Sequence, residues 1–186
     1  QDVFHIAHVA GTDLVNAPLG MAEPESEQAM VDGFAALCEA AAGEGLRVSL
    51  EFMPFNSLPD LATAYRVIRK AGCNNGGIML DCWHHHRGGG MPEQLLQIPG
   101  EHFFALQLDD AMPEPMADML EETLNHRRLP GEGCIDLAAT LGNLRRTGAD
   151  VVCDVEVFDD ALRALAPAER ARRLFDSSKA LLSQLS

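Results

Sequence analysis

Gly77-Ile-Met-Leu-Asp81 is an apolar run that closes in a carboxylate, and three other segments repeat this pattern. They are Arg47-Val-Ser-Leu-Glu51, Phe103-Phe-Ala-Leu-Gln107 and Val151-Val-Cys-Asp-Val-Glu156. Short, nearly continuous apolar runs are typical of parallel strands that are buried on both faces. We therefore expect strands over 47–52, 77–81, 103–108 and 151–157, each with an oxygen-bearing side chain near its end.

Amphipathic stretches separate these runs and extend the alternation to both ends of the chain. Residues 3–9 are expected to form a further strand, and helices are expected over 25–44, 58–71, 92–97, 136–146 and 167–185. This order predicts an α/β fold with a parallel sheet and right-handed crossovers. Both an open doubly wound sheet and a (β/α)₈ barrel satisfy it.

The choice between these architectures depends on loop motifs and on length. No GxGxxG or Walker loop follows any expected strand, which disfavours a nucleotide-binding open sheet. A complete barrel needs roughly 250 residues, whereas the 186 residues here hold five strand–helix units. We predict that residues 1–186 form a single domain, the C-terminal portion of a (β/α)₈ TIM barrel whose first three units are absent.

The amino-acid composition argues against nucleic-acid-binding and membrane-bound classes of protein. Asp and Glu number 28 against 14 Lys and Arg, for a formal net charge of −14. Such a surface repels nucleic-acid backbones and anionic membranes, so neither is expected as a partner. No apolar run is long enough to span a membrane and no signal peptide is visible. The five cysteines contain no CxxC pair, which favours a reducing cytoplasm.

The polar strand ends predict a metal site, because the carboxyl ends of barrel strands converge on one face. A single acidic residue after a strand is more often a helix N-cap, but four such endings make that alternative poor. Carboxylate and amide oxygens suit Mn²⁺ or Mg²⁺, with Co²⁺ or Zn²⁺ as alternatives. The expected ligands are Glu51, Asp81, Gln107 and Glu156.

Other residues are candidates for substrate binding at the same face. His84 follows Asp81 by three residues, and Arg128 opens a Leu-Pro-Gly-Glu-Gly turn. Asn56 and His8 could line the same mouth, although His8 could equally be a core histidine. The adjacent His85 and His86 are weaker candidates, since three consecutive histidines cannot all face one site and a surface histidine is usually just solvated.

Together these residues resemble the xylose isomerase-like barrel superfamily, particularly its sugar phosphate isomerase/epimerase branch. The matching motifs are Leu50-Glu51 with Asn56, Leu80-Asp81-x-x-His84, Leu106-Gln107-Leu108-Asp109-Asp110, Arg128-Leu-Pro-Gly-Glu-Gly133 and Val155-Glu156-Val157. The resemblance implies that Glu51, Asp81, Gln107 and Glu156 hold one divalent metal ion and that His84 contacts substrate. Many epimerases have His at the position of Gln107, whereas Gln occurs in relatives that look like 3-dehydroshikimate dehydratases. A barrel AP endonuclease of this superfamily uses a larger, histidine-rich cluster that is absent here.

The expected chemistry is proton transfer next to a carbonyl, with Glu51 and Glu156 as acid and base on opposite sides of a metal-stabilised enediolate. We expect an isomerase or epimerase of a sugar or related polyhydroxylated carbonyl compound. The alternatives are a metal-dependent dehydratase of an inosose or 3-dehydroshikimate type and a non-catalytic sugar-binding relative. A homo-oligomer is compatible with the sequence.

Overall fold

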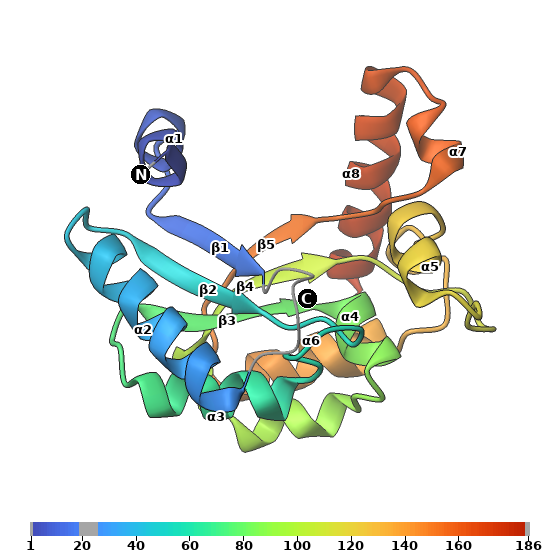
Figure 1. Ribbon diagram of the computed structural model, residues 1–186. Helices are drawn as coiled ribbons and strands as arrows, with labels where there is room; N and C mark the ends of the chain where they lie inside the picture. The colour runs from blue at the N-terminus through green and yellow to red at the C-terminus, as the bar shows by residue number, and fades with distance from the viewer. Residues whose placement is uncertain (1, 19–25, 185–186) are drawn as a thin grey trace.

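The curved parallel sheet of this protein forms a half-barrel (Figure 1). The computed structural model describes residues 2–18 and 26–184. Within these residues the sheet has five strands in the order β1-β2-β3-β4-β5, all parallel. They are β1 Leu14–Pro18, β2 Arg47–Glu51, β3 Gly76–Asp81, β4 Phe103–Leu108 and β5 Val152–Val155. The expectation of a partial (β/α)₈ barrel is confirmed.

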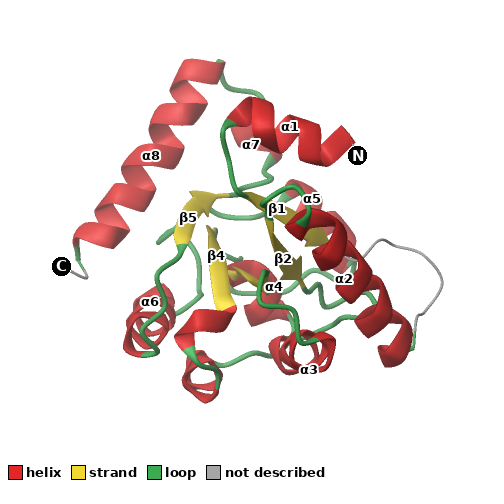
Figure 2. Cartoon of the chain, turned by 90° about the vertical axis from the view of Figure 1, so that its left-hand side faces the viewer, coloured by secondary structure: helices red, strands yellow, loops and turns green. Residues whose placement is uncertain are grey.

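Helices cover the outer face of the sheet. Figure 2 shows α2, α3 and α6 outside the strands, while α1 and α8 lie at the two ends of the half-barrel. The α-helices are α1 Asp2–Ala10, α2 Glu27–Ala42, α3 Leu61–Ala71, α4 Cys82–Arg87, α5 Met119–Asn125, α6 Leu137–Arg146, α7 Asp160–Arg163 and α8 Pro167–Ser183, with 3₁₀ turns over Pro92–Gln97 and Gly100–His102. None of the helices described is both long and apolar enough to cross a membrane.

Capping residues set the ends of the long helices, as the sequence indicates. Asp60 begins α3 by accepting a hydrogen bond from Thr63 N over 2.7 Å, and Gly72 ends it with a left-handed φ of 65°. Asp136 caps α6 in the same way. Of the expected helix 25–44, Glu25 lies outside the described residues, as does Leu185 of the expected helix 167–185.

The expected first strand is wrong, because residues 3–9 lie in helix α1. An apolar run of this length does not distinguish a helix from a buried strand by itself. The structure buries Ala7 while Val3 and Ile6 remain 57% and 63% exposed, so only one helical face packs. The true first strand, β1, was missed because Leu14-Val-Asn-Ala-Pro18 is short and contains Asn and Pro, which are rare in strands.

The pleat of the strands separates a core face from a polar face. Val48, Leu50, Ile78, Leu80 and Leu106 belong to the hydrophobic core that packs against the helices. Because side chains alternate along a strand, Glu51, Asp81 and Gln107 point to the opposite, inner face. Asp81 pairs with Gln107 in register, so these side chains lie at the same height at the carboxyl end of the sheet.

Candidate active site

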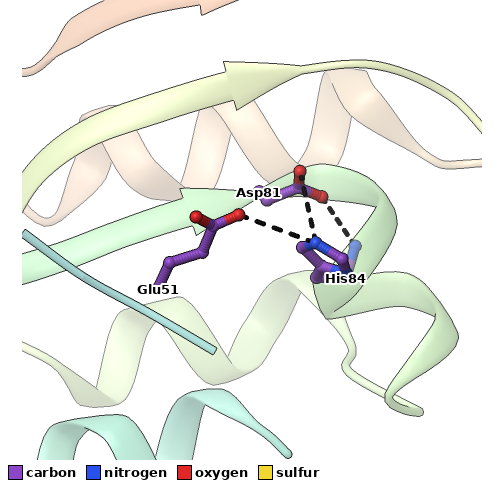
Figure 3. A group of neighbouring side chains, drawn as sticks. All are labelled: Glu51, Asp81 and His84. Atoms are coloured by element: carbon purple, nitrogen blue, oxygen red, sulfur yellow. Dashed lines mark hydrogen bonds and ion pairs between the residues drawn. The ribbon is translucent and has the colours of Figure 1, made fainter. Parts of the chain in front are cut away.

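A buried cluster of Glu51, Asp81 and His84 forms the centre of the carboxyl-terminal face (Figure 3). Glu51 ends β2, Asp81 ends β3, and His84 lies in α4, which begins directly after β3. Nε2 of His84 is 3.6 Å from Oε1 of Glu51 and 3.9 Å from Oδ2 of Asp81. Asp81 also caps α4 by accepting the backbone N–H of His84 over 2.7 Å. One oxygen of the Asp81 carboxylate therefore holds the backbone of His84, and the other faces its imidazole.

The guanidinium of Arg127 joins this cluster to the next strands. Its side chain is 2% exposed, and Nη1 lies 2.8 Å from Oδ2 of Asp81 and 3.3 Å from Oε2 of Glu156. Nη1 also donates to Asp109 over 2.5 Å. Nη2 lies 3.2 Å from Nε2 of His84. One buried cation thus contacts three carboxylates and the imidazole.

Gln107 and Glu156 form the other side of the site. Gln107 lies in β4, and its Nε2 donates a hydrogen bond to Oε1 of Glu156 over 3.1 Å. Glu156 follows β5 directly, and its backbone N–H donates to Leu108 O. Oε1 of Gln107 is buried and has no hydrogen-bond partner among the described residues. A buried, unsatisfied amide oxygen of this kind is available as a ligand.

Burial sets the protonation of the first cluster. It raises the pKa of Glu51 to about 7, and the charge of Asp81 adds to the rise, while a 2.5 Å hydrogen bond from Asn16 Nδ2 opposes it. Burial also lowers the pKa of His84 to about 4, assisted by the charge of Arg127 and opposed by that of Asp81. Near neutral pH the imidazole is therefore uncharged, and Glu51 can both give and take a proton.

Arg127 contacts both Asp81 and Asp109, but the pKa values of these two carboxyls shift in opposite directions. Burial alone would raise the pKa of Asp81, but Arg127 and His84 lower it below its ordinary value. Burial and the nearby Asp81 raise the pKa of Asp109 well above its ordinary value. Asp109 also accepts the backbone N–H of Trp83 over 2.8 Å. Asp81 is thus the charged carboxylate of the pair, and Asp109 ties the start of α4 to the end of β4.

A tight turn holds the segment that carries Arg127. Asp110 exchanges backbone hydrogen bonds with Arg128, and its carboxylate accepts the N–H groups of Gly131, Gly133 and Ile135. Any β-carbon at Gly133 would stand 2.3 Å from the carbonyl oxygen of Ala111. Glycine at position 133 is therefore required by close packing against Ala111 and Asp110.

A family model described as xylose isomerase-like TIM barrel matches residues 1–181. The chain belongs to this family. The resemblance drawn from the strand-end motifs is confirmed.

Several curated relatives of this family member are enzymes. A 3-dehydroshikimate dehydratase of Pseudomonas aeruginosa is 33% identical over 164 residues, covering 87% of this chain and 26% of that protein. An inosose isomerase of Bacillus subtilis is 32% identical over 136 residues, covering 72% of this chain and 48% of that protein. The chain thus spans about a quarter and about half of these relatives. The crystal structure of the IolI protein with a bound zinc atom has a TM-score of 0.90 at 26% identity, and it covers 100% of this chain and 68% of that one.

The donor set of this xylose isomerase-like protein is suited to a divalent cation. Ligand atoms of Glu51, Asp81 and His84 all lie within 4.8 Å of one another. Gln107, with its unsatisfied oxygen, pairs with Asp81 on the neighbouring strand, and the partly exposed Glu156 shares the Arg127 guanidinium with Asp81. The buried carboxylates outnumber the single guanidinium, and a cation would relieve their mutual repulsion. The structure therefore contains a group of residues able to hold a metal ion.

The remaining expected site residues lie in different surroundings. Asn56 is half-buried in the loop after β2, where its Oδ1 accepts the N–H of Leu58. Arg128 is half-exposed and contacts Asp159 over 3.4 Å. His8 does not end a strand: it is exposed on α1 and bonds Glu44, which lies just before the beginning of β2. His8 is therefore at the opposite end of the sheet from the cluster.

Sequence reasoning missed Arg127 and Asp109 as site residues. Arg127 belongs to an Arg-Arg pair just before a Pro-Gly-x-Gly turn, a pattern that is typical of solvated side chains. A signal was nevertheless present, because Leu129 is apolar and lies two positions away, the spacing that puts two side chains on one face of an extended segment. Both Arg127 and Leu129 are buried, whereas Arg128 between them turns outward.

Proposed function

We propose that the full-length protein is a divalent-metal-dependent isomerase or epimerase that moves a proton next to the carbonyl of a polyhydroxylated compound. The observation that carries the proposal is the buried cluster of Glu51, Asp81 and His84 at the strand ends, whose ligand atoms all lie within 4.8 Å of one another. Two carboxylates and an uncharged imidazole form a donor set that suits a divalent cation.

The proposed metal ligands are Glu51, Asp81, Gln107 and Glu156, with His84 next to them. When bound, a cation such as Mn²⁺ or Mg²⁺, or alternatively Co²⁺ or Zn²⁺, would polarise the substrate carbonyl and stabilise negative charge on its oxygen.

Glu51 and Glu156 are the proposed proton carriers. Glu51 ends β2 and Glu156 directly follows β5, with Asp81 on β3 between them, so a substrate held between the two glutamates would meet a carboxylate on each side. Glu51 would take the proton from the carbon beside the carbonyl, and Glu156 would return one at the other face or at the neighbouring carbon. His84, uncharged near neutral pH, would hydrogen-bond a substrate hydroxyl.

A dehydratase is the second candidate function. The Pseudomonas aeruginosa relative at 33% identity is named a 3-dehydroshikimate dehydratase. The same first step would serve it, because removing a proton beside the carbonyl prepares the loss of a β-hydroxyl. In either case we propose a cytoplasmic enzyme with a small-molecule substrate and no nucleic-acid or membrane partner.

The test is proton exchange in D₂O with Mn²⁺, using 2-keto-inositol, simple ketoses and 3-dehydroshikimate. Deuterium incorporation beside the carbonyl without loss of water would support the isomerase or epimerase. Appearance of an unsaturated product would support the dehydratase. Metal binding without exchange or turnover on any of these compounds would instead favour a non-catalytic sugar-binding protein.

A further inference from the structure

A second buried ion pair lies outside the cluster, between α4 and α5. Nε and Nη2 of Arg87 donate to Oε1 of Glu122 over 2.7 and 2.5 Å, and Nη2 also donates to the carbonyl of Met112 over 2.6 Å. The other oxygen of Glu122 accepts the N–H of Met116 over 2.8 Å. The two side chains are 6% and 0% exposed. One oxygen of this buried carboxylate therefore binds Arg87 of α4, and the other holds the segment before α5.

This ion pair ties α5 to α4, while Arg163 holds the last residues of α5 through Leu124 O and Asn125 Oδ1. The helix has seven residues, and its buried residues are Glu122 and Thr123, both polar. A helix this short is not stable by itself, and no fully buried apolar side chain holds it. The position of α5 thus depends on polar contacts, and among these the Arg87–Glu122 pair fixes its first half to α4.

The next residue along α5 holds the site arginine. Nη2 of Arg127 donates to Oγ1 of Thr123 over 2.8 Å, and Nε donates to Thr123 O over 3.1 Å. Arg127 in turn lies against His84, which shares helix α4 with Arg87. The contacts close a ring that runs from α4 through Glu122 and Thr123 to Arg127 and back to α4.

We propose that Arg87 and Glu122 are positioning residues that hold Arg127 among the strand-end carboxylates. Loss of the ion pair releases α5, Thr123 moves with it, and the guanidinium loses its place beside Asp81 and Glu156. The consequence for turnover rests on the proposed function, whereas the displacement of Arg127 does not.

Trp83 gives a direct readout of that displacement. It is the single tryptophan of the chain and is fully buried. Cζ of Arg127 lies 5.4 Å from its ring centroid, a distance at which a cation interacts with an aromatic face. The emission of Trp83 should therefore change when the guanidinium moves, with no substrate or metal needed.

The experiment is a double-mutant cycle between Glu122→Gln and Arg127→Lys in the full-length protein. We expect Glu122→Gln to alter the Trp83 emission and to lower kcat at least about tenfold, as small misplacements of a site group do. In the Arg127→Lys background Glu122→Gln should have no further effect on either quantity. Glu27→Gln is the matched control, because it removes another ion pair between elements, with Lys70 at 2.5 Å, on the surface.

Two results would overturn the proposal: a folded Glu122→Gln protein with wild-type Trp83 emission, or equal effects of Glu122→Gln in both backgrounds. If Glu122→Gln does not fold, Arg87→Lys replaces it in the cycle, since it keeps the charge and loses the two-pronged contact. If the wild type itself turns over no substrate, the proposed function fails and the emission cycle still decides the positioning role.

Discussion

Oε1 of Glu51 lies 3.6 Å from Nε2 of His84, and neither side chain is more than 8% exposed. With pKa values of about 7 and about 4, this acid and this base exchange their usual order of protonation. The imidazole stays neutral near pH 6, where the carboxyl still carries its proton. A cation that binds here near pH 6 must displace the proton of Glu51, whereas the imidazole of His84 beside it is already uncharged.

Metal binding should therefore release a proton in a pH-dependent way. At pH 6 a group with a pKa of about 7 is about nine-tenths protonated, so binding of Mn²⁺ should release about one proton from Glu51. At pH 8.5 the release should be close to zero. Calorimetry in buffers of different ionisation enthalpy measures this number, and Glu51→Gln should abolish it. Equal proton release by the wild type at both pH values would contradict the assignment.

The metal-free protein should lose stability with rising pH because of the same group. The folded-state pKa of Glu51 lies above its ordinary value, so its contribution is fully present below about pH 4.5 and is lost as the pH passes about 7. In EDTA at pH 8, Glu51→Gln should unfold with a free energy about 1–3 kcal/mol higher than the wild type. At pH 4 the two proteins should agree. Urea unfolding at both pH values tests the sign, which a less stable variant at pH 8 would reverse.

Glu156→Gln should separate metal binding from proton transfer. The amide keeps an oxygen of similar size but cannot carry the proton, so exchange of the substrate hydrogen should fall by about 10²–10⁴-fold. Metal content by plasma emission should remain measurable. A variant that keeps its metal and exchanges this hydrogen at the wild-type rate would remove Glu156 from the mechanism.

The two neighbouring arginines should differ in their effect on stability. Arg127→Met leaves Asp81 and Asp109 buried without their partner, which should cost about 3–5 kcal/mol. Arg128→Met breaks only a 3.4 Å contact of a 40% exposed side chain and should cost at most about 1 kcal/mol. Urea unfolding of both variants measures the difference. Equal losses would mean that Arg127 does not carry the charge balance of the site.

Two glycines provide a matched test of the turn under Arg127. Gly133→Ala places a β-carbon 2.3 Å from a backbone oxygen and should destabilise the fold by about 1–3 kcal/mol. Gly142 lies in α6 with open space around it, so Gly142→Ala should stabilise by about 0.5–1 kcal/mol. Thermal unfolding of the two variants should therefore show shifts of opposite sign. A Gly133→Ala protein as stable as the wild type would refute the packing argument.

The carboxyl ends of the strands could be predicted from the sequence because two local rules apply there together. A buried strand must be apolar, and a parallel strand must end at a common edge, so the carboxylates of Glu51 and Asp81 stand out. Helix caps follow another local rule, since Asp60 and Asp136 each accept a backbone N–H from the first turn of the helix that they begin. Residues 3–9 failed this test because an apolar run carries no period that separates a strand from a one-sided helix.

By itself the sequence determined the parallel α/β alternation and the polar residues at or beside the ends of β2, β3, β4 and β5, since both can be read from the apolar runs and the amphipathic stretches between them. The tertiary structure alone decided that Arg127, and not Arg128, enters the site, because Asp110 pairs with Arg128 and turns its neighbour inward. The tertiary structure also decided the pKa of Glu51, which is raised by burial and by the charge of Asp81. The sheet brings Glu51 and Asp81 together, although they are far apart along the chain. Such charges interact through space, and no local pattern of residues records their distances.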